Sequence, residues 1–132
     1  MTNMPFIKNV DCVSLKVDNI DKAIDFYSNK LGHELKWRTA TSAGMKFAEG
    51  ESELVIYTEQ RPPGTDPLVE SVPIAIEQFL KAGGQLDYGP IEIPVGLFAI
   101  MKDPWNNKIN ILDLSKGTFK VDQNRNVIGL GR

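Results

Sequence analysis

The stretch of sequence that decides the fold occurs twice. Residues 17–27 read VDNIDKAIDFY, and residues 69–79, which lie 52 positions later, read VESVPIAIEQF. Valine matches valine, acid matches acid, and Asn19 matches Ser71, both of which are favoured residues before the first turn of a helix. Gly32 falls on Gly84 at the same offset. The match indicates an internal repeat, which predicts two related modules within one structural domain.

Each module is predicted to have the order β-α-β-β-β. The helices have apolar residues spaced by three and four, with Leu31 and Leu80 as the last of them, and a glycine follows each helix. This order makes the fold class α+β. We expect a first module over 1–60, a Pro-rich linker over 61–64, a second module over 65–114 and a C-terminal tail over 115–132. The predicted strands are 11–17, 34–39, 45–48 and 53–58 in the first module, and 66–69, 85–88, 98–102 and 108–113 in the second, with turns at 42–44, 49–51, 95–96 and 104–107.

The composition limits the classes of protein to which the chain can belong. It has 132 residues, of which 42% are hydrophobic and 24% charged, and a net charge of −2. This balance is typical of a globular protein, and the absence of a basic excess argues against a nucleic-acid partner. No apolar run approaches the roughly 18 residues of a membrane span, and residues 1–7 lack the apolar core of a signal peptide. We therefore expect a cytoplasmic protein with no membrane partner.

The chain has very few residues suited to metal or nucleophilic chemistry. Cys12 is its one cysteine, which excludes a disulfide framework, and His33 is its one histidine. Cysteine is also a small hydrophobic residue that is often buried, and this is our interpretation of Cys12. The tail over 115–132 has no counterpart in the repeat. It can form a hairpin, dock on a partner subunit or be loosely ordered, and the sequence leaves these alternatives open.

Several short motifs occur in the order and spacing of a known superfamily. They are LKVDNI at 15–20, FY at 26–27, LG at 31–32, AGG at 82–84, GP at 89–90 and DPWNN at 103–107. With the repeat, they make residues 7–114 resemble the vicinal oxygen chelate superfamily. That group includes glyoxalase I, bleomycin-resistance proteins, fosfomycin-resistance enzymes and extradiol dioxygenases. The resemblance implies curved mixed sheets that form a cleft between the two modules, and a homodimer.

The resemblance also locates four positions at which metal-dependent members hold an ion. They lie on the first and last strands of each module and correspond here to Cys12, Val55, Gly64 and Asn110. Valine and glycine have no side-chain donor, whereas zinc needs three or four nitrogen, sulfur or oxygen ligands. We therefore predict no metal and no other cofactor. A site made from Cys12, Glu53, Asp66 and Asn110 stays open as a speculative alternative.

Alternation along the strands predicts which side chains would face the cleft. On the first strand Val13, Leu15 and Val17 would pack under the helix, and on the last strands Leu54, Ile56, Ile109 and Ile111 would do the same. The residues between them form a mixed polar and apolar wall of the kind that binds small molecules. The predicted ligand-binding residues are Cys12, Ser14, Lys16, Glu53, Tyr57, Lys108 and Asn110.

The sequence favours a glyoxalase/bleomycin-resistance-like protein that binds a small organic molecule in the cleft without the family metal. The alternative is a metal-dependent lyase, isomerase or thiol transferase of the glyoxalase I type. A third hypothesis is metal-free acid/base catalysis by Glu53 together with Lys16 or Lys108. Glu53 and Lys16 are thus the catalytic candidates, and the sequence does not decide whether the protein is an enzyme.

Overall fold

The computed structural model of the chain describes residues 5–131 and divides them into two compact units. One unit comprises residues 11–65 together with 119–131, and the other comprises residues 66–118 together with the N-terminal residues up to 10. Residues 1–4 and 132 lie outside the described residues. They include part of the segment expected to lack a signal peptide (1–7) and the last residue of the predicted tail (115–132). Within residues 5–131, no helix is both long and apolar enough to span a membrane.

The unit built from the first module contains one helical segment and a four-stranded mixed sheet. The sheet has the order β2-β3-β4-β1, in which β1 and β4 run parallel and the other pairs antiparallel. Its core packs Ile20 and Ala23 of the helix against Met45, Leu54 and Ile56 of the sheet. The elements, in chain order, are β1 (Asn9–Lys16), α1 (Ile20–Ile24), the π-helical turn η1 (Asp25–Lys30), β2 (Leu35–Arg38), β3 (Ser42–Lys46) and β4 (Glu53–Tyr57).

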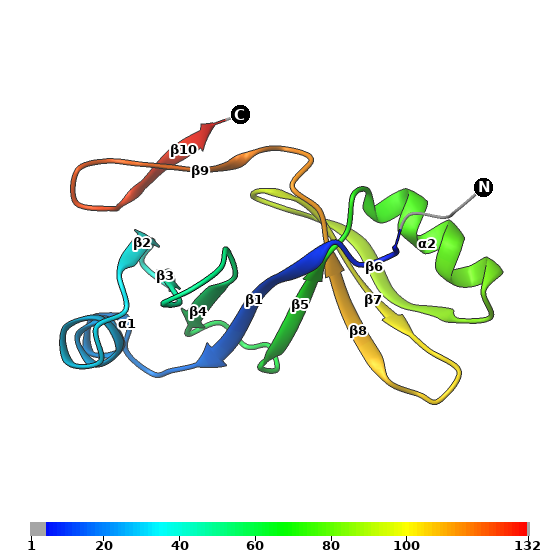
Figure 1. The fold of residues 1–132 in the computed structure, drawn as a ribbon, viewed down its shortest axis with the longest axis horizontal. Helices are drawn as coiled ribbons and strands as arrows, with labels where there is room; N and C mark the ends of the chain where they lie inside the picture. Colours follow the sequence, from blue (N-terminus) through cyan, green and yellow to red (C-terminus); the bar gives the residue numbers. More distant parts are fainter. Residues whose placement is uncertain (1–4, 132) are drawn as a thin grey trace. The chain divides into compact units, whose positions relative to one another are not determined.

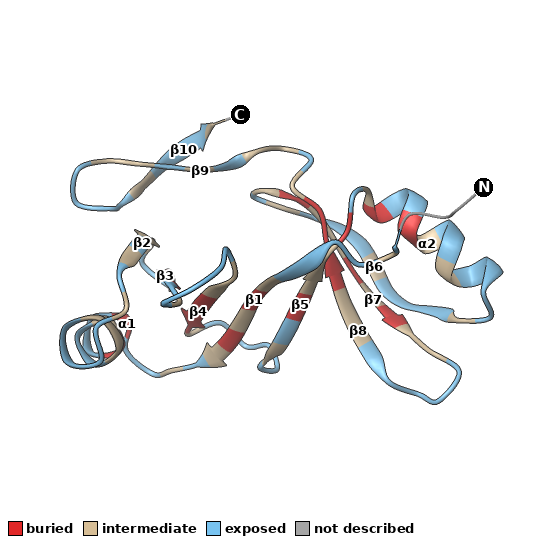
Figure 2. Ribbon diagram, in the orientation of Figure 1, coloured by how far each residue is buried: buried red, intermediate tan, exposed pale blue. Residues whose placement is uncertain are grey.

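The unit built from the second module repeats this order (Figure 1). Its strands are arranged β5-β8-β7-β6, with β5 and β8 parallel. The core lies between α2 and the sheet and includes Val72, Ala75, Met101 and Ile111, and Figure 2 shows buried residues on α2, β7 and β8. The elements are β5 (Gly64–Leu68), α2 (Val72–Lys81), β6 (Gln85–Ile93), β7 (Gly96–Lys102) and β8 (Lys108–Leu112). The predicted α+β fold with two β-α-β-β-β modules is therefore confirmed.

The repeated stretch forms the two helix starts, as its sequence predicts. The Asn19 side chain accepts a hydrogen bond from the Lys22 N–H, and the Ser71 side chain accepts one from the Ile74 N–H. Two apolar positions assigned to the buried helix faces are wrong, because Leu31 is 55% exposed and Leu80 is 48% exposed. Both side chains come at the end of their helical segments and lie outside the cores that the earlier turns form.

Two predicted boundaries in the sheets are also wrong. Residues 42–44 form the start of β3 instead of a turn, because Gly44 lies in the strand under the side chain of Trp37. The predicted strand 85–88 continues to Ile93, and irregularities in its pairing with β7 carry it past Gly89 and Pro90. In both places a glycine that suggests a turn is used within a strand.

The tail forms a two-stranded hairpin and groups with the first module (Figure 1). Its strands are β9 (Thr118–Val121) and β10 (Val127–Gly131). The Asp122 carboxylate accepts hydrogen bonds from the Asn124 and Asn126 N–H groups at 2.8 and 3.0 Å, which closes the turn between the strands. The described part of this segment is thus a hairpin, and its docking on a partner subunit stays a prediction.

Candidate functional site

A candidate site lies on the face of the first module's sheet that turns away from α1. In the pairing of β1 with β4, Cys12 lies opposite Glu53, Ser14 opposite Val55, and Lys16 opposite Tyr57. Neighbouring residues across a strand pair share a face, so these six side chains belong together. Leu15, Leu54 and Ile56 alternate with them and pack in the core. The predicted alternation on β1 and β4 is therefore correct.

Glu53 is held in place by an indole group from β2. Trp37 Nε1 donates a hydrogen bond of 2.9 Å to Glu53 Oε1, and both side chains are half-buried. The indole can reach β4 because it crosses Gly44 of the intervening strand, where any Cβ atom would overlap the ring. Within the described part of the chain, Glu53 Oε2 accepts no hydrogen bond. This oxygen is an available acceptor on the candidate face.

Ser14 and Cys12 are buried on the same strand. Ser14 is 1% exposed, and its Oγ donates a hydrogen bond of 3.1 Å to the Gly64 carbonyl. Cys12 is 5% exposed, which agrees with its interpretation as a small buried side chain. These two residues contribute to the packing of the face at β1.

Cationic groups gather where β4 ends. The Arg61 guanidinium carbon lies 3.8 Å from the centroid of the Tyr57 ring, and the Tyr57 hydroxyl donates a hydrogen bond of 2.8 Å to the Arg61 carbonyl. Lys16 Nζ donates to Gln60 Oε1 at 2.8 Å. Glu53 and Tyr57 lie at opposite ends of β4, about 13 Å apart along four residues of strand, and the cations gather at the Tyr57 end. The face thus has Glu53 at one end and Lys16 with Arg61 at the other, where Arg61 Nε also lies 3.6 Å from Glu59 Oε1.

The remaining predicted residues belong to the second module. Asn110 Nδ2 donates to Asp66 Oδ1 at 3.5 Å, which is long for a hydrogen bond. Lys108 Nζ lies 3.3 Å from Asp87 Oδ2 and is well exposed, so it forms a surface ion pair. Of the predicted site residues, the structure thus groups Cys12, Ser14, Lys16, Glu53 and Tyr57 on one face and places Lys108 and Asn110 on β8 of the other unit.

The residues at the four family metal positions do not fit a metal ion. Val55 has no donor atom, and the carbonyl of Gly64 is the acceptor for Ser14. The Asn110 amide nitrogen is directed to Asp66. His33, the one histidine, has its Nδ1 3.0 Å from the Lys46 carbonyl oxygen. Across residues 5–131, no three His, Cys, Asp or Glu side chains are grouped so that they could hold an ion.

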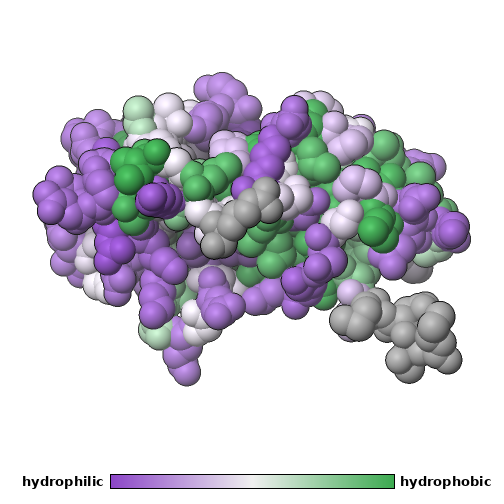
Figure 3. Space-filling model, turned by 90° about the horizontal axis from the view of Figure 1, so that it is seen from above, coloured by the Kyte–Doolittle hydropathy of each residue, from purple (hydrophilic) through white to green (hydrophobic). Residues whose placement is uncertain are grey.

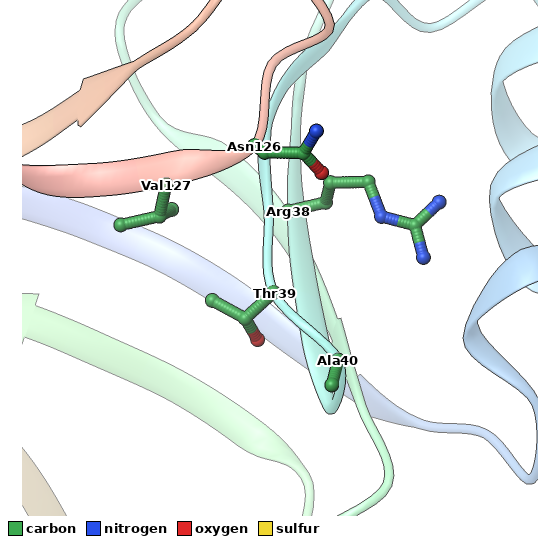
Figure 4. Close-up of a pocket in the computed structure, with 5 residues that line it drawn as sticks. All are labelled: Arg38, Thr39, Ala40, Asn126 and Val127. Carbon is green, nitrogen blue, oxygen red and sulfur yellow. The ribbon is translucent and has the colours of Figure 1, made fainter.

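A shallow pocket of about 480 Å³ lies beside β2 and contains none of the predicted residues. Figure 4 shows the Arg38 and Asn126 side chains projecting in the same direction from two segments far apart in the sequence. The Arg38 guanidinium is already 2.7 Å from Asp21 Oδ1, so its charge has a partner. The pocket is lined by Arg38, Thr39, Ala40, Asn126 and Val127.

Sequence reasoning did not recognise the partners that organise the face. The sequence motifs indicate neither Trp37 as the donor to Glu53 nor Phe119 as the ring that packs against Trp37. The ring centroids of Trp37 and Phe119 are 4.7 Å apart. One signal was available, since a glycine within a strand often marks a close approach of another group, as at Gly44.

Comparison with known proteins identifies the superfamily. The model of the Glyoxalase/Bleomycin resistance protein/Dioxygenase superfamily matches residues 9–111, and the chain belongs to that superfamily. A search of curated proteins found no match.

Solved structures with the same fold include proteins of different activities. Methylmalonyl-CoA epimerase from Mycobacterium tuberculosis is 16% identical with a TM-score of 0.68, and the match covers 86% of this chain and 92% of that one. A structure described as NAD-dependent benzaldehyde dehydrogenase from Legionella pneumophila is 20% identical with a TM-score of 0.64, and the match covers 78% and 97%.

A variant of homoprotocatechuate 2,3-dioxygenase from B. fuscum is 15% identical with a TM-score of 0.58. That match covers 83% of this chain and 33% of the dioxygenase chain, so this chain corresponds to about a third of that protein. At such low identity these likenesses show the fold, and the same fold serves unrelated reactions.

Proposed function

We propose that the protein binds a small organic molecule against the β1–β4 face of its first module, using its own side chains and no metal ion. The observation that supports this most strongly is the half-buried Glu53 carboxylate, with one oxygen bound to Trp37 and the other available. A carboxylate in this state is a strong acceptor for an N–H or O–H group of a ligand. The ligand would therefore carry such a donor.

The surroundings of Glu53 support a ligand with an apolar body. Val55 and Cys12 flank Glu53 on the paired strands as buried apolar side chains, so the surroundings of the carboxylate are largely apolar. Small-molecule sites combine apolar surroundings with a few fixed polar groups that orient the ligand. The donor set at the family metal positions supports binding without a metal, since Val55 and Gly64 cannot supply ligands from their side chains.

The proposal can be tested with aromatic amine, amide and carboxylic acid fragments added to isotope-labelled protein. We expect amine and amide fragments to shift the amide resonances of β1 and β4 in ¹H–¹⁵N spectra. Replacing Glu53 with glutamine removes the charge and keeps the shape. Its affinity for these fragments is expected to fall about tenfold, because a hydrogen bond to a charged group is worth about 1.5 kcal/mol more than no such bond.

The matched control is Glu51→Gln, which removes the same charge from an exposed loop residue two positions away. This variant should bind the fragments as the original protein does. The proposal fails if no fragment shifts the resonances of this face, or if Glu53→Gln and Glu51→Gln bind equally well. Binding that appears only after a divalent metal is added would favour the glyoxalase I type of activity instead.

A further inference from the structure

The C-terminal hairpin contacts the candidate site although it lies outside the repeat. The superfamily match ends at residue 111, and β9 begins at Thr118. The hairpin nevertheless groups with residues 11–65 of the first module. A two-stranded hairpin is marginally stable by itself, so contacts with the rest of the unit are needed to hold it.

Backbone contacts attach the hairpin to β2, the strand that carries Trp37. The Arg38 N–H donates a hydrogen bond of 2.9 Å to the Arg125 carbonyl, and Arg38 forms a parallel bridge with Asn126. The turn of the hairpin is therefore fixed to the residue directly after Trp37. The ion pair between Arg125 and Glu34 is 3.9 Å long and lies between exposed side chains, so it adds little.

Phe119, the aromatic residue of β9, makes a further contact with β2. The Phe119 ring packs against the Trp37 ring with centroids 4.7 Å apart and planes tilted by 50°, and both residues are half-buried. Gly44 provides the surface on which the indole lies, and Glu53 accepts its N–H. The indole thus has contacts with β3, β4 and β9, and its position depends on all of them.

We propose that the hairpin is a working part of the ligand site, because Phe119 holds the Trp37 indole in place and the indole orients the Glu53 carboxylate toward a ligand donor. Phe119 and Trp37 are positioning residues in this scheme, and Glu53 makes the contact with the ligand. The inference rests on the proposed function for its ligand. Its structural part, the control of the indole by the hairpin, can be measured without any ligand.

Exposed apolar side chains elsewhere on the molecule give weaker support for a functional role than Phe119 does. Figure 3 shows hydrophobic residues interspersed with hydrophilic ones on the face that it displays. Exposed side chains such as Trp105 and Ile128, at 78% and 59%, have nothing in the structure to indicate a partner. Phe119 differs from them because it is half-buried against a residue that contacts the site.

The test uses Trp37 as a single reporter. The chain has two tryptophans, so Trp105→Phe, which changes an exposed turn residue, leaves one indole N–H resonance and one tryptophan emission, which is excited selectively over the three tyrosines. In this background we expect Phe119→Ala to move the indole resonance and the emission maximum toward those of solvent-exposed tryptophan. It should also weaken the binding of amine and amide fragments severalfold. Phe119→Leu, which keeps an apolar contact, should restore much of both signals.

Two further variants calibrate the result. Glu53→Gln in the same background gives the indole resonance without its charged acceptor. Ile128→Ala, on the exposed face of β10, should change neither the indole resonance nor the fragment affinity. The proposal is overturned if Phe119→Ala leaves the indole signals unchanged, or if it changes them without changing the affinity. If the original protein binds no fragment, the proposed function fails, and the role of the hairpin is decided by the indole signals alone.

Discussion

Replacing Asp113 with alanine is expected to lower the free energy of unfolding by about 3 kcal/mol, because the change leaves buried donors without an acceptor. The Asp113 side chain follows β8 and is 1% exposed. Its carboxylate accepts hydrogen bonds from the Val72 N–H at 2.8 Å, the Leu97 N–H at 2.9 Å and the Ser115 hydroxyl at 2.7 Å. It thereby joins the start of α2, the start of β7 and the end of β8.

The same contacts give this stabilisation a dependence on pH. Burial raises the pKa of Asp113, but the hydrogen bonds from Val72, Ser115 and Leu97 together outweigh it, so the pKa is held below its ordinary value of 3.8. The unfolded chain binds the proton more readily than the folded one. The stabilisation is therefore fully present above pH 3.8 and is lost as the pH falls through the lower pKa of the folded state.

Urea denaturation tests both the size of the stabilisation and its dependence on pH. The original protein and Asp113→Ala are compared near neutral pH and in acid below pH 3.8. The difference in stability should be largest near neutral pH and should shrink in acid. Asp18→Ala, at an exposed position before α1, is the control and should cost much less. An Asp113→Ala variant as stable as Asp18→Ala near neutral pH would contradict this account of the second module.

Replacing Gly44 with valine is expected to displace the Trp37 indole and to separate it from Glu53. A Cβ atom at Gly44 would overlap Nε1 and the neighbouring carbon atoms of the ring. We expect a loss of about 2 kcal/mol in the free energy of unfolding, which is typical of overpacking. The affinity for amine and amide fragments should fall by about tenfold or more, because Glu53 loses the group that orients it.

The cause of this loss can be isolated with a double-mutant cycle. In a Trp37→Ala background the space of the indole is vacant, so Gly44→Val should cost much less stability than it does in the original protein. Gly129→Val, at a position on β10 where nothing lies within 4 Å of an added Cβ atom, should be nearly neutral. Equal costs of Gly44→Val in the two backgrounds would contradict the close packing of Trp37 on Gly44.

Much of the fold could be predicted from the sequence because the repeat marks it twice. The helix starts at Asn19 and Ser71 and the alternation on β4 depend on local patterns, and both are correct. The turn expected at residues 42–44 is wrong. A glycine in this local sequence suggests a turn, but Gly44 lies in a strand, where the Trp37 ring from the neighbouring strand leaves no room for a side chain. Local residue preferences cannot separate these two uses of glycine.

The candidate site could be predicted only in part. Alternation places Ser14, Glu53 and Tyr57 on one face, since it depends only on the period of a strand. The contact of Trp37 with Phe119 joins residues distant in the sequence and has no local pattern. Asp113, at the end of a strand, resembles an ordinary solvent-exposed acid until the structure shows the three elements that it joins.

The central claim is that the β1–β4 face binds a small molecule without a metal. The most direct measurement is fragment binding by ¹H–¹⁵N spectroscopy on protein purified without chelator, with its metal content determined on the same sample. We expect no stoichiometric nickel, zinc, manganese or iron, and the same affinity before and after treatment with EDTA. One metal ion per chain, whose removal abolishes binding and whose return restores it, would contradict the claim.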